Sequence, residues 1–170
     1  MIKNNKVLIY LIFFSFSLGQ SSWFGGNLKG INKLGFKLNL KGSDDDAWGR
    51  RLESFFELRF LENKLELNST QMPKLVVDIN IVDSRVEPVS SFLVVFSIYN
   101  YSVPESEYYN SMGSGELTKK LMTSKIFSKE IIGQSSSNTL YKNIEKNINK
   151  LISDFFDQWF KDNPMKQFEY

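Results

Sequence analysis

The chain contains no cysteine and no histidine among its 170 residues. Without cysteine no disulfide can form, so we expect the hydrophobic core alone to hold the fold. Without histidine, Ser-His-Asp and Cys-His nucleophilic systems and the usual zinc sites are excluded. Any catalysis would therefore depend on carboxylate, Lys, Tyr or Arg side chains. Since no cysteine follows the N-terminal segment, we also expect that the protein is not a bacterial lipoprotein.

The chain also lacks an apolar run long enough to span a membrane, which takes roughly 20 residues. The run Val7–Phe16 is shorter, follows two lysines and is followed by the small residues Ser17 and Gly19. This pattern is typical of a secretory signal peptide that is cleaved before Gln20. We therefore predict a signal peptide over residues 1–19 and export to the periplasm or outer envelope, with a retained N-terminal anchor as the alternative.

The chain also lacks an excess of basic over acidic residues, or of acidic over basic ones, once the predicted signal peptide is removed. The full chain has 21 Lys and Arg against 19 Asp and Glu, and loss of Lys3 and Lys6 with the signal peptide leaves 19 of each. A neutral domain has no electrostatic reason to bind nucleic acid or acidic lipid. Nucleic acid is accordingly not an expected partner, and after cleavage we do not expect an integral membrane protein.

The length and the hydrophobic fraction of 42% suit one domain with a single core. Residues 20–30 contain Gly25 and Gly26 beside Trp23 and Phe24, which predicts a flexible N-terminal segment. We expect one domain over residues 31–164 and a C-terminal tail over residues 165–170.

Alternating apolar and polar residues predict the strands, because successive side chains of a strand point to opposite faces of a sheet. The expected strands are residues 31–40, a short edge strand at 64–67, and residues 73–82, 90–103 and 121–132. The segment before the last of them, residues 104–116, is polar and predicts a loop. Strands that follow one another through short connections favour an antiparallel meander. The sequence thus predicts an α+β fold: a two-layer sandwich with an antiparallel sheet of four to five strands and two helices, in the order β-α-(β)-β-β-β-α.

The run Asp44–Asp46 is the most conspicuous candidate site. Ser43 is a typical helix N-cap, and carboxylates stabilise the first turn of a helix through its free N–H groups and dipole. Trp48, Leu52, Phe55 and Phe56 follow at helical spacing. The run therefore indicates a helix start. The competing interpretation is a divalent metal site formed by Asp44, Asp45 and Asp46, although the spacing of a calcium-binding loop is missing.

The last helix has the strongest periodicity. Its apolar stripe comprises Leu140, Ile144, Ile148, Leu151, Ile152, Phe155 and Trp159. Asn163 and Pro164 end it, since proline disfavours a helical residue before it. At about 100° per residue, Phe156 and Phe160 fall on the rim of the stripe. They either cover the edge of the sheet or form a contact surface for a partner or lipid.

Four stretches, LGFKLNLKG, RRLESFFELRF, KLVVDINIV and SKIFSKEII, precede the final helix, which ends in LISDFFDQWFKDNP. In order and pattern the chain resembles the lipopolysaccharide-assembly lipoprotein family and other small exported envelope proteins of bacteria, over residues 31–164. The resemblance implies an accessory role in envelope assembly or transport, without the lipid-bearing cysteine of that family, and it assigns no functional residue.

The sequence has no GxGxxG, Walker or HExxH motif, and we expect no cofactor. Our leading hypothesis is a non-catalytic exported envelope protein that binds a protein partner or an amphiphile. The alternatives are a carboxylate- or metal-dependent hydrolase and a self-associating exported structural subunit.

Overall fold

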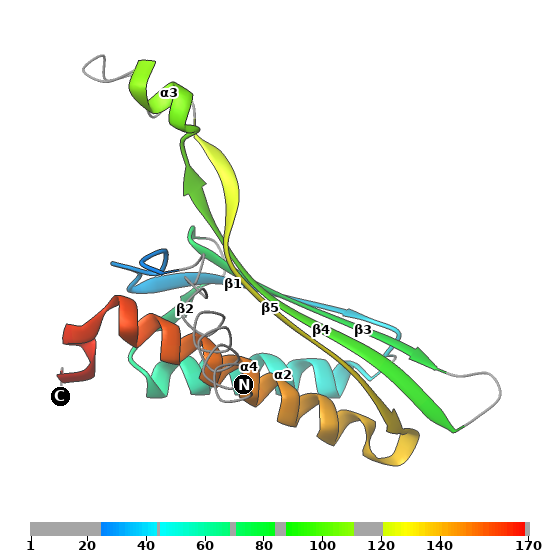
Figure 1. The fold of residues 1–170 in the computed structure, drawn as a ribbon. Helices are drawn as coiled ribbons and strands as arrows, with labels where there is room; N and C mark the ends of the chain where they lie inside the picture. The colour runs from blue at the N-terminus through cyan, green and yellow to red at the C-terminus, as the bar shows by residue number, and fades with distance from the viewer. Residues whose placement is uncertain (1–24, 44, 69–70, 84–87, 111–120, 169–170) are drawn as a thin grey trace, which may run out of the picture.

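The computed structural model describes residues 25–43, 45–68, 71–83, 88–110 and 121–168 (Figure 1). Its elements are β1 (Lys33–Lys41), α2 (Asp46–Glu62), β2 (Glu66–Asn68), β3 (Lys74–Asp83), β4 (Val89–Ser102), α3 (Glu105–Asn110), β5 (Met122–Ser136) and α4 (Leu140–Asp162), with short 3-10 turns at Ser137–Thr139 and Pro164–Phe168. The fold is α+β, as predicted. Of the described helices, none has the length and apolar character needed to cross a membrane.

The sheet is mixed, so the predicted antiparallel sheet is wrong. Its strand order is β2-β1-β3-β4-β5; β1 runs parallel to both β2 and β3, and only β3, β4 and β5 form an antiparallel meander. The expectation of an antiparallel meander holds for consecutive strands that are joined by short hairpin loops. Between β1 and β2 the 17-residue helix α2 intervenes, and a connection of this length allows a parallel crossover.

The connection from β2 to β3 must cross β1, because β1 lies between these two strands. The crossing takes place at Gly35, where the N–H donates to the carbonyl of Pro73 at 2.8 Å. A Cβ on Gly35 would collide with the carbonyl oxygen of Gln71. Glycine is therefore required at this position so that the connecting backbone can pass close to β1.

Both long helices, α2 and α4, lie on the same face of the sheet, which gives two layers; none of the described helices covers the other face (Figure 1). The covered face is that of Leu75, Val77, Ile79, Ile81, Phe92, Val94, Phe96 and Ile98, the alternate apolar residues of the predicted strands 73–82 and 90–103, and all eight are buried. Phe155 of α4 links the layers, since its ring centroid lies 5.5 Å from Phe60 of α2 and 5.6 Å from Phe96 of β4.

The residues before β1 are held in place by the end of α4. The side chain of Asp162 accepts hydrogen bonds from the N–H groups of Gly26 and Leu28, at 2.9 and 3.0 Å, and the Trp159 ring donates to the carbonyl of Ile31 at 2.9 Å. Leu28 is fully buried. Residues 26–31 thus pack against the end of α4, whereas residues 20–24 of the expected flexible segment, like the predicted signal peptide, lie outside the described residues.

The strands β4 and β5 continue beyond the rest of the sheet. Tyr99 is the last residue of β4 that pairs with β3, and Asn100–Ser102 then pair with Met122–Ser124 alone. A β-bulge between Ile98 and Tyr99 marks the departure, and bulges bend a strand and increase its twist. In Figure 1 this two-stranded ribbon, together with α3, forms an arm that projects from the body. We call residues 100–110 and 121–124 the β4–β5 arm.

Candidate functional site

The aspartate run begins a helix, as predicted, but Ser43 is not the cap. The N-cap of α2 is Asp45, whose Oδ1 accepts a hydrogen bond from the N–H of Trp48 at 2.9 Å. The helix begins two residues later than a Ser43 cap would require. The Ser43 hydroxyl instead accepts from the N–H of Asp45 at 3.3 Å and lies 3.2 Å from the Tyr141 hydroxyl of α4. Asp44 lies outside the described residues.

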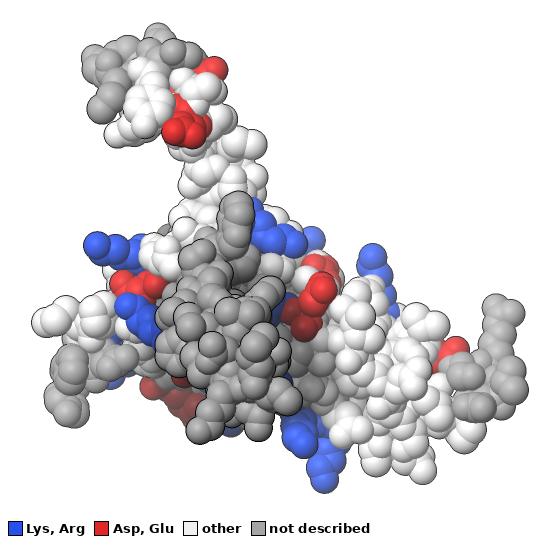
Figure 2. Space-filling model, viewed as in Figure 1, with Lys and Arg blue, Asp and Glu red and all other residues white. Residues whose placement is uncertain are grey.

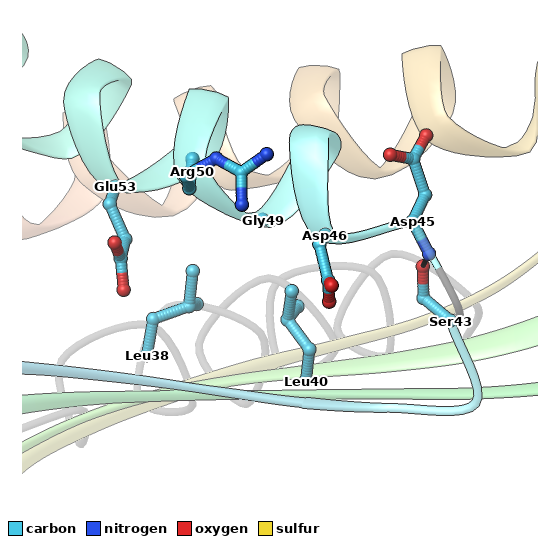
Figure 3. A pocket seen from close by; sticks show the side chains of 8 residues that line it. All are labelled: Leu38, Leu40, Ser43, Asp45, Asp46, Gly49, Arg50 and Glu53. Carbon is cyan, nitrogen blue, oxygen red and sulfur yellow. Dashed lines mark hydrogen bonds between the residues drawn. The ribbon is translucent and has the colours of Figure 1, made fainter.

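A cavity of about 310 Å³ lies between the start of α2 and β1 (Figure 3). Its lining residues are Leu38, Leu40, Ser43, Asp45, Asp46, Gly49, Arg50 and Glu53. In Figure 3 the carboxylates of Asp46 and Glu53 point toward β1, whereas that of Asp45 points away from it. The described residues contain no group of three or more Asp or Glu side chains placed to hold a metal ion. The cavity combines an apolar floor with a charged rim.

The two aromatic residues proposed as a contact surface differ in their burial. Phe156 is 5% exposed, and its ring lies 5.0 Å from Phe60 and 5.0 Å from Phe155. It therefore belongs to the core, and its predicted place on the rim is wrong: the ring of Phe60 on α2 widens the buried side of α4. Phe160 is half-buried, with its ring 5.0 Å from Trp159. A partner contact at Phe160 stays a prediction.

The end of the β4–β5 arm concentrates exposed apolar side chains. Tyr101, Tyr108, Tyr109, Leu121 and Met122 are each between 45% and 64% exposed. They account for half of the ten large hydrophobic residues that are exposed in the described part of the chain. We call these five residues the arm tip. By the pairing of Tyr101 with Thr123 and of Ser102 with Met122, the side chains of Tyr101 and Met122 lie on opposite faces of the ribbon. The end of the arm thus presents exposed apolar side chains on both faces, and concentrated exposed apolar surface marks interaction sites.

Backbone hydrogen bonds at the end of the arm place Tyr108 and Tyr109 of the tip on a short helix. The carbonyl of Pro104 accepts hydrogen bonds from the N–H groups of Glu107 and Tyr108, at 3.0 and 2.9 Å, and so begins the one-and-a-half-turn helix α3. The rings of Tyr108 and Tyr109 meet edge to face at 5.7 Å. The predicted loop over residues 104–116 is thus partly helical. Residues 111–120 lie outside the described part of the chain.

In the described part of the chain, no helix or further strand packs on the arm, so its apolar residues do not belong to the core formed by the sheet and the helices. An isolated two-stranded ribbon is marginally stable in water. Figure 2 shows the arm end standing clear of the body, with acidic but no basic atoms visible among its described residues on this face. In sequence, residues 101–122 carry three glutamates and two lysines. The tip is therefore aromatic, and the sequence around it is slightly acidic.

Sequence reasoning missed the arm tip because it treated residues 104–116 as an ordinary polar loop. Two signals were available. The predicted strand 90–103 extends past the length of its neighbour 73–82, and three tyrosines occur within nine residues, at Tyr101, Tyr108 and Tyr109.

No family model matches the chain, and neither the curated proteins nor the solved structures contain a match. The resemblance to the lipopolysaccharide-assembly lipoprotein family therefore stays an expectation, and the function must be argued from the surfaces just described.

Proposed function

We propose that this chain is an exported, non-catalytic envelope protein that binds a protein partner through the arm tip. The observation that carries the proposal is the cluster of Tyr101, Tyr108, Tyr109, Leu121 and Met122 at the end of a ribbon that leaves the sheet. Tyrosine combines a large apolar ring with a hydroxyl group, and it is enriched at protein interfaces for this reason.

A protein partner fits the arm tip better than an amphiphile does. A lipid-like ligand would need a large apolar space between the sheet and the helices, but aromatic rings fill the centre of that layer, and the cavity beside β1 is small and has a charged rim. Phe155 alone lies within 5.0–5.7 Å of Phe60, Phe96, Phe127 and Phe156. An anionic lipid surface would require an excess of basic residues near the tip, but glutamates outnumber lysines in the sequence of residues 101–122.

The size of the tip indicates how a partner would bind. A buried tyrosine contributes roughly 150–250 Å², so three half-exposed tyrosines offer on the order of 300 Å². A stable interface buries about 800 Å² on each partner. The contact would therefore extend along the arm toward Tyr99, which lies on the same face of β4 as Tyr101, two residues away. Such an extended contact requires a macromolecule.

The test is affinity capture from envelope extracts with immobilised protein lacking residues 1–19. A variant with Tyr101→Ser, Tyr108→Ser and Tyr109→Ser should lose the captured protein, while its melting temperature stays that of the wild type because the tip lies outside the core. The matched control is Val82→Ser with Ile132→Ser, two exposed apolar residues away from the arm, and it should still capture the protein. The proposal would be refuted if the triple variant still captured the protein. It would also be refuted if the control variant failed to capture it.

The second candidate is a self-associating structural subunit, which the long edge strand β5 favours. An exposed strand edge can pair with another copy. Two features oppose pairing at this edge: Lys125 and Lys129 lie on the strand, and the Asn27 side chain donates a hydrogen bond to the carbonyl of Ile126 at 3.2 Å. Sedimentation across a range of protein concentrations separates this candidate from the first. The hydrolase alternative remains a hypothesis that no observation on the described residues favours.

A further inference from the structure

The strand β1 has an open edge over most of its length. It pairs with β3 from Gly35 to Lys41, but with β2 from Lys33 to Gly35 only. In the described part of the chain, Phe36–Lys41 therefore have no strand partner on the β2 side. The N–H of Gly35 points to the β3 side, where it donates to Pro73. Because strand residues alternate in direction, the N–H and C=O groups of the even-numbered residues from Phe36 to Leu40 point to the open edge.

The side chains of the same residues are incompletely covered. Leu38 pairs with Val77 and Leu40 pairs with Ile79 on the helix side of the sheet. Val77 and Ile79 are fully buried, whereas both leucines are half-buried. The difference arises because, among the described residues, β1 has a neighbouring strand on one side only at this point. The side chains of a further strand, placed in line with β2, would complete the layer.

The space for such a strand is the cavity of about 310 Å³ between β1 and α2. Figure 3 shows Leu38 and Leu40 rising from β1 toward the helix, which passes above them. Gly49 keeps the helix side of the cavity open, since a Cβ there would lie 3.0 Å from the Leu40 side chain. The volume lies at the lower end of the range for binding pockets and suits a few side chains rather than a large cofactor.

The rim adds a charge preference. Three carboxylates, Asp45, Asp46 and Glu53, and one guanidinium, Arg50, line the cavity. Their net charge of −2 favours a basic occupant. This acidic rim lies beside an unpaired backbone edge, whereas the edge of β5 is partly capped by Asn27; both strands carry lysines, Lys37 and Lys41 on β1. The edge of β1 is therefore the better place for a new strand.

We propose that the groove between β1 and α2 binds an extended basic segment of a partner protein by β-strand addition in line with β2. The open edge of six residues is about 20 Å long at about 3.3 Å per residue, so a segment of similar length would fit. Main-chain hydrogen bonds to Phe36, Leu38 and Leu40 supply affinity, and alternate apolar side chains of the segment enter the cavity. This site is separate from the arm tip, and either proposal can fail without the other.

The first measurement uses amide hydrogen exchange on the free protein lacking residues 1–19. The amides of Phe36, Leu38 and Leu40 should lack protection, whereas those of Lys37 and Asn39, which face β3, should be protected. Protection of Leu38 and Leu40 in the free protein would mean that another part of this chain already occupies the edge. That result would overturn the proposal.

The second measurement selects binders from a library of random ten-residue peptides displayed on phage. Selected peptides should alternate apolar residues with other residues, carry Lys or Arg, and shift the resonances of Phe36–Lys41. Binding should be lost in Leu38→Pro, because proline removes the outward N–H yet is tolerated at a strand edge. Glu53→Lys, which leaves the backbone unchanged, should weaken binding several-fold, and Asp157→Lys, an exposed acid on α4, should not.

Failure of the library to yield such peptides would overturn the proposal, as would equal binding to Glu53→Lys and to the wild type. A selected motif with helical rather than alternating spacing would do the same. Should Leu38→Pro fail to fold, Glu53→Lys and the resonance shifts still decide the outcome.

Discussion

Phe155 should be among the most costly residues of the chain to truncate. Its side chain is fully buried, and its ring contacts Phe60 of α2, Phe96 of β4 and Phe127 of β5, at centroid distances of 5.5, 5.6 and 5.7 Å. Phe155→Ala removes these contacts at the centre of both layers and leaves a cavity that surrounding rigid elements cannot fill. Such substitutions cost about 3–5 kcal/mol, out of about 5–15 kcal/mol for a typical domain.

Phe160 provides the matched control on the same helix. It is half-buried, and full burial of a phenylalanine side chain contributes about 1.5–3 kcal/mol, so Phe160→Ala should cost about 1 kcal/mol. Urea unfolding at 25 °C measures the loss of unfolding free energy in both variants, provided that the slope of this free energy against urea concentration is the same as in the wild type. Equal losses at the two positions, or a loss below about 1 kcal/mol for Phe155→Ala, would refute the account of the core.

Three further predictions concern the helix start, the strand crossing and the N-terminus. Asp45→Ala should lower the free energy of unfolding by about 0.5–2 kcal/mol because it removes the N-cap of α2; Ser43→Ala should cost less, and a larger loss at Ser43 in urea unfolding would reverse the assignment. Gly35→Ala should cost more than about 1 kcal/mol, since its Cβ would collide with the carbonyl of Gln71, and an unchanged melting temperature would show that the crossing lies elsewhere. The exported protein should begin at Gln20, and an intact mass that still includes residues 1–19 in the envelope fraction would contradict signal-peptide cleavage.

The elements that could be predicted from the sequence are those in which apolar residues recur at the period of a strand or a helix, because this period reflects one buried face. The alternation of Leu75, Val77, Ile79 and Ile81 and the apolar stripe of α4 both indicate one buried face, and the structure buries these residues. Periodicity does not record which strand lies beside which. The position of β1 between β2 and β3 depends on the crossing at Gly35, and an isolated glycine in a strand pattern does not reveal what passes over it.

The arm tip was missed for a related reason. Tyr101 continues the alternation of β4, so nothing local distinguishes a strand inside a sheet from a ribbon that has left it. The distinction arises because β3 begins at Lys74, opposite Tyr99, and the pairing register is a property of the assembled sheet. Phe156 was misplaced because the width of a helix's buried face depends on what packs against it, here Phe60 of α2.

The most direct test of the proposed function is site-specific photo-crosslinking from the arm tip. Because the chain has no cysteine, Tyr108→Cys offers a unique attachment point for a benzophenone group, and Leu61→Cys, on the exposed side of α2, is the control. In envelope extracts, illumination should join a discrete protein to position 108 and not to position 61. Identical adducts at both positions, or adducts with lipid alone at position 108, would contradict a protein-binding role for the arm.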